Sequence, residues 1–143
     1  MKIILILFLL FQSVTTFSQT IKSKLLKEKI GALTCENVMQ INLTNNDTSY
    51  YFFCSFQNTE YQHIIDIGSI MISRKNKLTT TINQLNQCLK YMETGKVDFS
   101  IGPFILYDFA KVLYIYDDNK KTTISKKSVI KLINFLERCK LDY

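Results

Sequence analysis

The stretch IIDIGSIMISRKNKLTTTINQLNQCLKYM, residues 64–92, changes its hydrophobic period part-way along and so decides the fold class. Residues 64–73 alternate around Gly68, which is typical of a β-strand with a bulge at the glycine. Apolar side chains then recur every three or four residues and form one stripe of a helix that Gly95 ends: Leu78, Ile82, Leu85, Leu89 and Met92. Strand and helix signals in one continuous chain predict an α+β domain.

Further strand signals lie on the N-terminal side of this stretch. Residues 38–43 alternate weakly, Asn45–Asp47 form a turn cluster and 50–56 is an aromatic run, which together predict a β-hairpin. The segment 21–30 is ambiguous. Its lysines suit a mobile arm, but four apolar side chains fit a helical face: Ile21, Leu25, Leu26 and Ile30.

The second half of the chain repeats this order. Residues 97–107 and 110–116 are typical of strands, and 122–124 of a short third strand. A second helix follows, begun by Ser125 or Ser128, because a serine hydroxyl can accept a hydrogen bond from a first-turn backbone N–H. A shift of 51 residues superposes four stripe positions of the two helices: Leu78 on Val129, Ile82 on Ile133, Leu85 on Leu136 and Cys88 on Cys139.

This order predicts two β-β-β-α units, whether or not they arose by duplication. Neither the strands nor the helix stripes can leave their apolar sides in water. The expected architecture is therefore two-layered, with a mostly antiparallel sheet and both amphipathic helices on one of its faces.

The N-terminus predicts export. Lys2 precedes a nine-residue apolar run and a polar stretch, the order found in a signal peptide, so we expect residues 1–18 to be removed and 19–143 to form a single globular domain. The apolar run is too short for a stable membrane anchor, since a spanning helix needs about 20 residues. The alternative is a buried N-terminal helix.

The amino-acid composition bears on the class of partner and on the division into domains. The net charge is +6, one unit of which belongs to Lys2, and the lysines are spread in pairs rather than gathered on one face. We therefore expect no nucleic-acid partner. A glycine count of four and a single proline, Pro103, leave no linker to divide the domain.

Four cysteines in an exported chain permit two disulfides. Cys88 and Cys139 occupy matching positions of helices expected side by side, which favours a bond between them and leaves Cys35 with Cys54 as the residual pair. A buried free thiol is an equal alternative for Cys54, which alternates with two phenylalanines. The cysteine spacings of 19, 34 and 51 do not suit a metal site, and we expect no cofactor.

No catalytic motif is recognisable. His63 is the only histidine, and no glycine-flanked nucleophile elbow is present in the sequence. Asp117 and Asp118 lie in a turn, where aspartates are favoured by backbone hydrogen bonding alone. A cleft that places His63 beside a carboxylate or thiol would point to an enzyme.

A binding surface is suggested by strand alternation. With the helices on one face of the sheet, an aromatic face is left on the other, carrying Tyr51, Phe53, Tyr114 and Tyr116. The alternative is that residues 20–34 fold across this face as a lid, with Leu25, Leu26 and Ile30 beneath it.

The start MKIILILFLLFQSVTTFSQ resembles the export signals of Bacteroidetes-type bacteria, and Thr123–Lys127 with the following helix resembles the ends of short secreted proteins of that group. The resemblance implies a location in the bacterial envelope and no catalytic residue. We expect an exported, non-catalytic interaction or structural protein of the periplasm or cell surface, acting on a protein partner or by self-association. The alternative is a small secreted enzyme or enzyme inhibitor.

Overall fold

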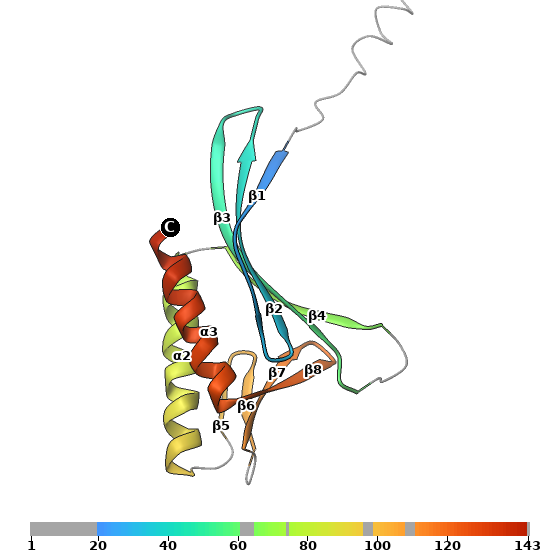
Figure 1. Ribbon diagram of the computed structural model, residues 1–143, viewed down its shortest axis with the longest axis vertical. Helices are drawn as coiled ribbons and strands as arrows, with labels where there is room; N and C mark the ends of the chain where they lie inside the picture. Colours follow the sequence, from blue (N-terminus) through green and yellow to red (C-terminus); the bar gives the residue numbers. More distant parts are fainter. Residues whose placement is uncertain (1–19, 61–64, 74, 96–98, 108–110, 143) are drawn as a thin grey trace, which may run out of the picture.

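The structure is a computed structural model that describes residues 20–60, 65–73, 75–95, 99–107 and 111–142. This part of the chain contains two antiparallel four-stranded sheets and two α-helices, so the predicted α+β class is confirmed (Figure 1). The predicted signal peptide and His63 lie outside the described residues.

The first sheet is an antiparallel meander in chain order. Its strands are β1 (Thr20–Ile30), β2 (Leu33–Asn42), β3 (Asp47–Gln57) and β4 (Ile67–Ile72). The ambiguous N-terminal segment is β1, an edge strand, and is neither a helix, a mobile arm nor a lid. Pairing with β2 satisfies the backbone groups on one side of β1, and Ile30 is fully buried in the core.

The second sheet is also a meander, with strands β5 (Phe99–Ile101), β6 (Phe104–Leu106), β7 (Val112–Asp117) and β8 (Lys120–Ser125). The single strand predicted over 97–107 is split into β5 and β6. Gly102 adopts a φ of +57° and Pro103 follows it, so the chain turns back at this point. Each half of the described chain thus contains four strands and a helix, one strand more than the predicted unit.

The prediction of one sheet with both helices on one face is not confirmed, because the strands form two sheets. Helix α2 (Lys75–Thr94) separates β4 from β5 and is about 30 Å long. The second meander pairs with itself and contacts the first sheet through β7 and β8, which lie against β4. Helix α3 (Lys126–Cys139) contacts β1, β7 and β8, whereas α2 contacts β5 and β6. A short 3-10 helix, Lys140–Asp142, follows α3.

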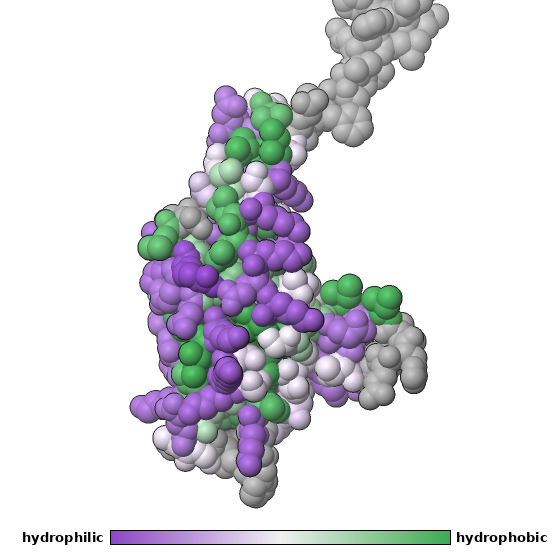
Figure 2. Space-filling model, in the orientation of Figure 1, coloured by the Kyte–Doolittle hydropathy of each residue, from purple (hydrophilic) through white to green (hydrophobic). Residues whose placement is uncertain are grey.

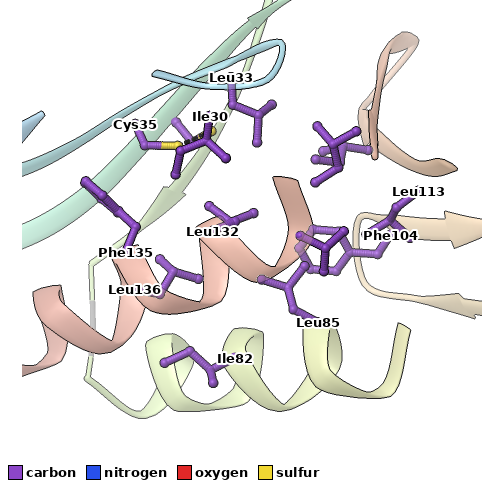
Figure 3. Packing of buried hydrophobic residues seen from close by; sticks show 14 of the residues in the cluster. Ile30, Leu33, Cys35, Ile82, Leu85, Phe104, Leu113, Leu132, Phe135 and Leu136 are labelled. Atoms are coloured by element: carbon purple, nitrogen blue, oxygen red, sulfur yellow. Dashed lines mark hydrogen bonds between the residues drawn. The ribbon is translucent and has the colours of Figure 1, made fainter. Parts of the chain in front are cut away.

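One hydrophobic core joins the two sheets and the two helices. Figure 3 shows α3 between the first sheet and α2, with Leu132 and Phe135 directed toward Ile30 and Cys35. The predicted helical stripes are confirmed, since seven of the eight superposed positions are buried and the eighth, Ile133, packs against the core. Each such side chain contributes roughly 1.5–3 kcal/mol when it is removed from water.

The bulge predicted at Gly68 is absent, because β3 and β4 pair in unbroken register. Gly68 is required for a different reason: a Cβ at this position would lie 2.4 Å from the ring of Phe56, a buried core residue. The register shift in this sheet lies instead in β1, between Lys24 and Leu26.

The predicted Cys88–Cys139 disulfide is not present. All four cysteines are buried, and no disulfide joins any two of them. Cys88 and Cys139 lie on neighbouring helices, where only some facing positions bring two Cα atoms within the roughly 7 Å that a disulfide requires. The residual pair is the one brought together, since Cys35 and Cys54 are direct partners across β2 and β3.

Asn58 links the two sheets. This residue follows β3 and is almost fully buried. Its Oδ1 accepts hydrogen bonds from the backbone N–H of Lys121 on β8 (3.2 Å) and of Glu60 (3.1 Å). Its Nδ2 donates to a carboxylate oxygen of Asp66 (2.9 Å). The end of β3 is thereby joined to the second sheet.

Candidate binding groove

A groove of about 450 Å³ lies on the first sheet, on the face opposite α3. Alternation along β3 sends Phe52 and Cys54 into the core and leaves Tyr51 and Phe53 half-buried on the opposite face. The lining residues come from all four strands and their ends: Lys22, Glu36, Val38, Gln40, Ser49, Tyr50, Tyr51, Phe53, Met71 and Ser73.

The floor of the groove is apolar. Val38 is the direct partner of Tyr51, and Glu36 of Phe53, across β2 and β3. Val38 is 5% exposed yet does not belong to the main core cluster, which places its side chain on the groove face. Met71 lies opposite Phe53 on β4 and is 65% exposed. Two aromatic rings, a valine and an accessible methionine therefore offer a contact surface for an apolar ligand.

The charges beside the groove are mostly positive. Glu36 receives ion pairs from Lys24 (2.8 Å) and Lys27 (2.9 Å), which lie on the neighbouring edge strand. The hydrogen bond from Lys24, and then that from Lys27, holds the pKa of Glu36 below its usual value. Lys22 also lines the groove and forms no ion pair with any described residue. Two lysines thus neutralise the one carboxylate of the lining, and Lys22 adds a further positive charge opposite Gln40.

A separate tyrosine cluster lies on the second sheet. The rings of Tyr114 and Tyr116 are stacked 6.4 Å apart, and Tyr107 meets Tyr114 edge-on at 5.1 Å. The hydroxyl oxygens of Tyr107 and Tyr116 are 3.2 Å apart and share a hydrogen bond. This bond, together with partial burial, raises the pKa of Tyr116 to about 12.

The four residues predicted to share one aromatic face are therefore divided between two sheets. Tyr51 and Phe53 line the groove, whereas Tyr114 and Tyr116 belong to the tyrosine cluster. Strand alternation correctly placed each of them opposite the core side of its own strand. The sequence reasoning missed Lys22, Glu36 and Val38, although the same alternation along 33–42 would have placed Glu36 and Val38 together.

The chain matches no protein-family model, no curated protein and no solved structure.

The described ranges contain neither a metal-ligand cluster nor a membrane-spanning helix. No three side chains of His, Cys, Asp or Glu come together as metal ligands would. Neither α2 nor α3 has the length and apolar character required to cross a membrane.

Proposed function

We propose that this chain is an exported, non-catalytic binding protein of the bacterial envelope, and that it holds a small amphiphilic anion in the groove of the first sheet. The observation that carries the proposal is Lys22, which has no ion-pair partner among the described residues, beside an apolar floor of Val38, Tyr51 and Phe53. The export part rests on the sequence of residues 1–18.

The size and lining of the groove support a small ligand. Its volume of about 450 Å³ falls within the roughly 300–1,000 Å³ that is usual for small-molecule sites. Such sites combine apolar and aromatic walls with a few polar groups that orient the ligand. Here the aromatic floor would receive the body of the ligand, and Lys22 would receive its negative group.

Charge complementarity favours an anion over a cation. Lys24 and Lys27 already neutralise Glu36, so no free carboxylate remains in the lining to attract a positive group. Lys22 has no such partner among the described residues and is exposed at the rim. A group that pairs with Lys22 gains a contact that is weak in isolation but sets the orientation of the ligand.

The proposal is tested with two fluorescent probes that share an aromatic body. Anilinonaphthalene sulfonate is anionic and N-phenylnaphthylamine is neutral. We expect Phe53→Ala to weaken both probes about tenfold, because an aromatic contact worth about 1.4 kcal/mol is lost. Lys22→Gln should weaken only the anionic probe, by up to about fivefold, as for an exposed ion pair. Fluorescence titration gives both affinities.

Two matched variants serve as controls. Tyr114→Ala removes an aromatic side chain from the second sheet, and Lys131→Gln removes an exposed lysine from α3. Neither should change the affinity for either probe. The circular dichroism of the aromatic side chains must match that of the unaltered protein in every variant, since these probes also bind loosely packed states. Unchanged binding by Phe53→Ala would exclude the groove as the site.

A further inference from the structure

Two thiols face each other inside the first sheet. Cys35 of β2 and Cys54 of β3 are direct cross-strand partners, and their sulfur atoms lie 3.3 Å apart. Both side chains belong to the hydrophobic core, with exposures of 0% and 1%. Figure 3 shows Cys35 on the α3 side of the sheet. Two nucleophilic groups are thus held in contact in a place where the proposed groove does not use them.

We propose that Cys35 and Cys54 are a site of covalent modification and become a cross-strand disulfide in an oxidising compartment. Directly opposite residues of antiparallel strands have Cα atoms about 4.5 or 5.5 Å apart. Disulfides span Cα distances of about 4.4–6.8 Å, so the β2–β3 ladder already provides the required backbone separation. Only a rotation of the two side chains separates the thiol contact from a bond.

The reaction is a thiol–disulfide exchange with a small or protein disulfide as the oxidant. One cysteine, as the thiolate, attacks a sulfur of the oxidant and displaces one thiol. The second cysteine then attacks the mixed disulfide and displaces the other. One sulfur–sulfur bond forms, one breaks, and the two electrons and two protons leave with the oxidant, which becomes two thiols.

Burial sets the order of events. In the folded protein the hydrogen bond between the two thiols, and then burial, raises the pKa of Cys54, so little thiolate is present there. An oxidant also cannot reach either sulfur beneath α3. The exchange must therefore take place while β2 and β3 are paired but α3 has not yet docked. Once formed, the bond is enclosed by the core and protected from reductants.

The same reasoning leaves Cys88 and Cys139 as thiols. Both are fully buried, but they lie on different helices and not at opposite positions of a strand ladder. Burial raises the pKa of Cys88 to about 11. These two residues provide an internal reference for the experiment.

The test refolds the full chain from denaturant in a buffer of reduced and oxidised glutathione. The protein is then unfolded and treated with iodoacetamide, and its mass is measured. We expect alkylation of Cys88 and Cys139 only, and a disulfide-linked peptide pair containing Cys35 and Cys54 on non-reducing mapping. The Cys88→Ala/Cys139→Ala variant should take up no iodoacetamide, whereas the Cys35→Ala/Cys54→Ala variant should be alkylated at both remaining thiols.

Two results would overturn the proposal. The first is alkylation of all four cysteines in a protein whose far- and near-ultraviolet circular dichroism shows that it has refolded. The second is a linked peptide that contains Cys88 or Cys139. If the unaltered chain aggregates, the double variant that retains only Cys35 and Cys54 decides the question, since recovery of both as free thiols in folded protein excludes the bond.

Discussion

On the second sheet, the side chain of Tyr107 alters the pKa of Tyr116. The hydrogen bond between Tyr107 and Tyr116 stabilises the neutral phenol of Tyr116 and is the largest cause of its raised pKa. A phenol in an unfolded chain has a pKa of about 10. The difference in the Tyr116 pKa between the folded and unfolded protein contributes to the free energy of unfolding. This contribution is present in full below pH about 10 and is lost as the pH rises from about 10 to about 12.

We expect Tyr107→Phe to return the pKa of Tyr116 toward 10. At pH about 11 the Tyr116 phenol should then be mostly ionised, whereas in the unaltered protein roughly one molecule in ten should be. The chemical shift of the tyrosine Cζ carbon, followed by NMR against pH, measures this. Tyr114→Phe is the matched control, because it retains the hydrogen bond and should cause a smaller change. A Tyr116 pKa that stays near 12 in Tyr107→Phe would contradict the assignment.

Among the elements, α3 contacts both sheets and the other helix. It packs on β1, β7 and β8 as well as on α2. Its first turn is capped by Ser125, whose Oγ accepts a hydrogen bond from the backbone N–H of Ser128 at 3.3 Å. The turn between β1 and β2 lies against the same end of the helix, since a Cβ on Gly31 would be 2.7 Å from the Ser128 hydroxyl. The first turn of α3 therefore packs against the β1–β2 turn of the first sheet.

Ser125→Ala should lower the free energy of unfolding by about 1 kcal/mol, because the N–H of Ser128 loses its acceptor. Ser125→Asp should retain most of the stability, since a carboxylate accepts the same bond and suits the positive end of the helix. Urea denaturation followed by circular dichroism gives both values. A Ser125→Ala variant as stable as the unaltered protein would show that the cap contributes nothing.

At the scale of the whole molecule, the two sheets are held together by a small polar junction in addition to the core. Asn58 is its centre, and Ser69 on β4 adds a backbone hydrogen bond to the Asp117 carboxylate at 2.8 Å. Figure 2 shows hydrophobic side chains on the surface at the upper end of the molecule. Ile21 and Leu25 of β1 and Leu43 of the β2–β3 turn are among the exposed apolar side chains. At that end, the hairpin of β2 and β3 extends beyond the second sheet (Figure 1).

We expect Asn58→Ala to destabilise the protein by about 1–3 kcal/mol, because partly buried N–H groups lose their acceptor. The backbone amides of Lys121 and Glu60 should lose protection from hydrogen exchange more than amides in the centre of β2. Thr44→Ala, a change in an exposed turn, is the control and should leave exchange at Lys121 unaltered. Unchanged protection of Lys121 in Asn58→Ala would mean that the core alone holds the sheets together.

Local periodicity was sufficient to determine the helices and the direction of most strand side chains. The stripe from Leu78 to Cys88 is buried as the spacing predicts, and so is its counterpart from Val129 to Cys139 except for the partly buried Ile133. Phe52 and Cys54 likewise face the core, opposite Tyr51 and Phe53. These features follow from the helix repeat of 3.6 residues and the strand repeat of two, which depend only on neighbours along the chain.

Tertiary structure alone decided which strands became neighbours. Alternation assigns a side chain to a face but does not name the partner strand, so it could not reveal that Tyr51 and Tyr114 belong to different sheets or that Cys35 lies opposite Cys54. The groove has the same origin, because Lys22, Val38 and Tyr51 come from three strands aligned by their register. Register depends on the turns and on packing across the core, and both involve residues far apart in the sequence.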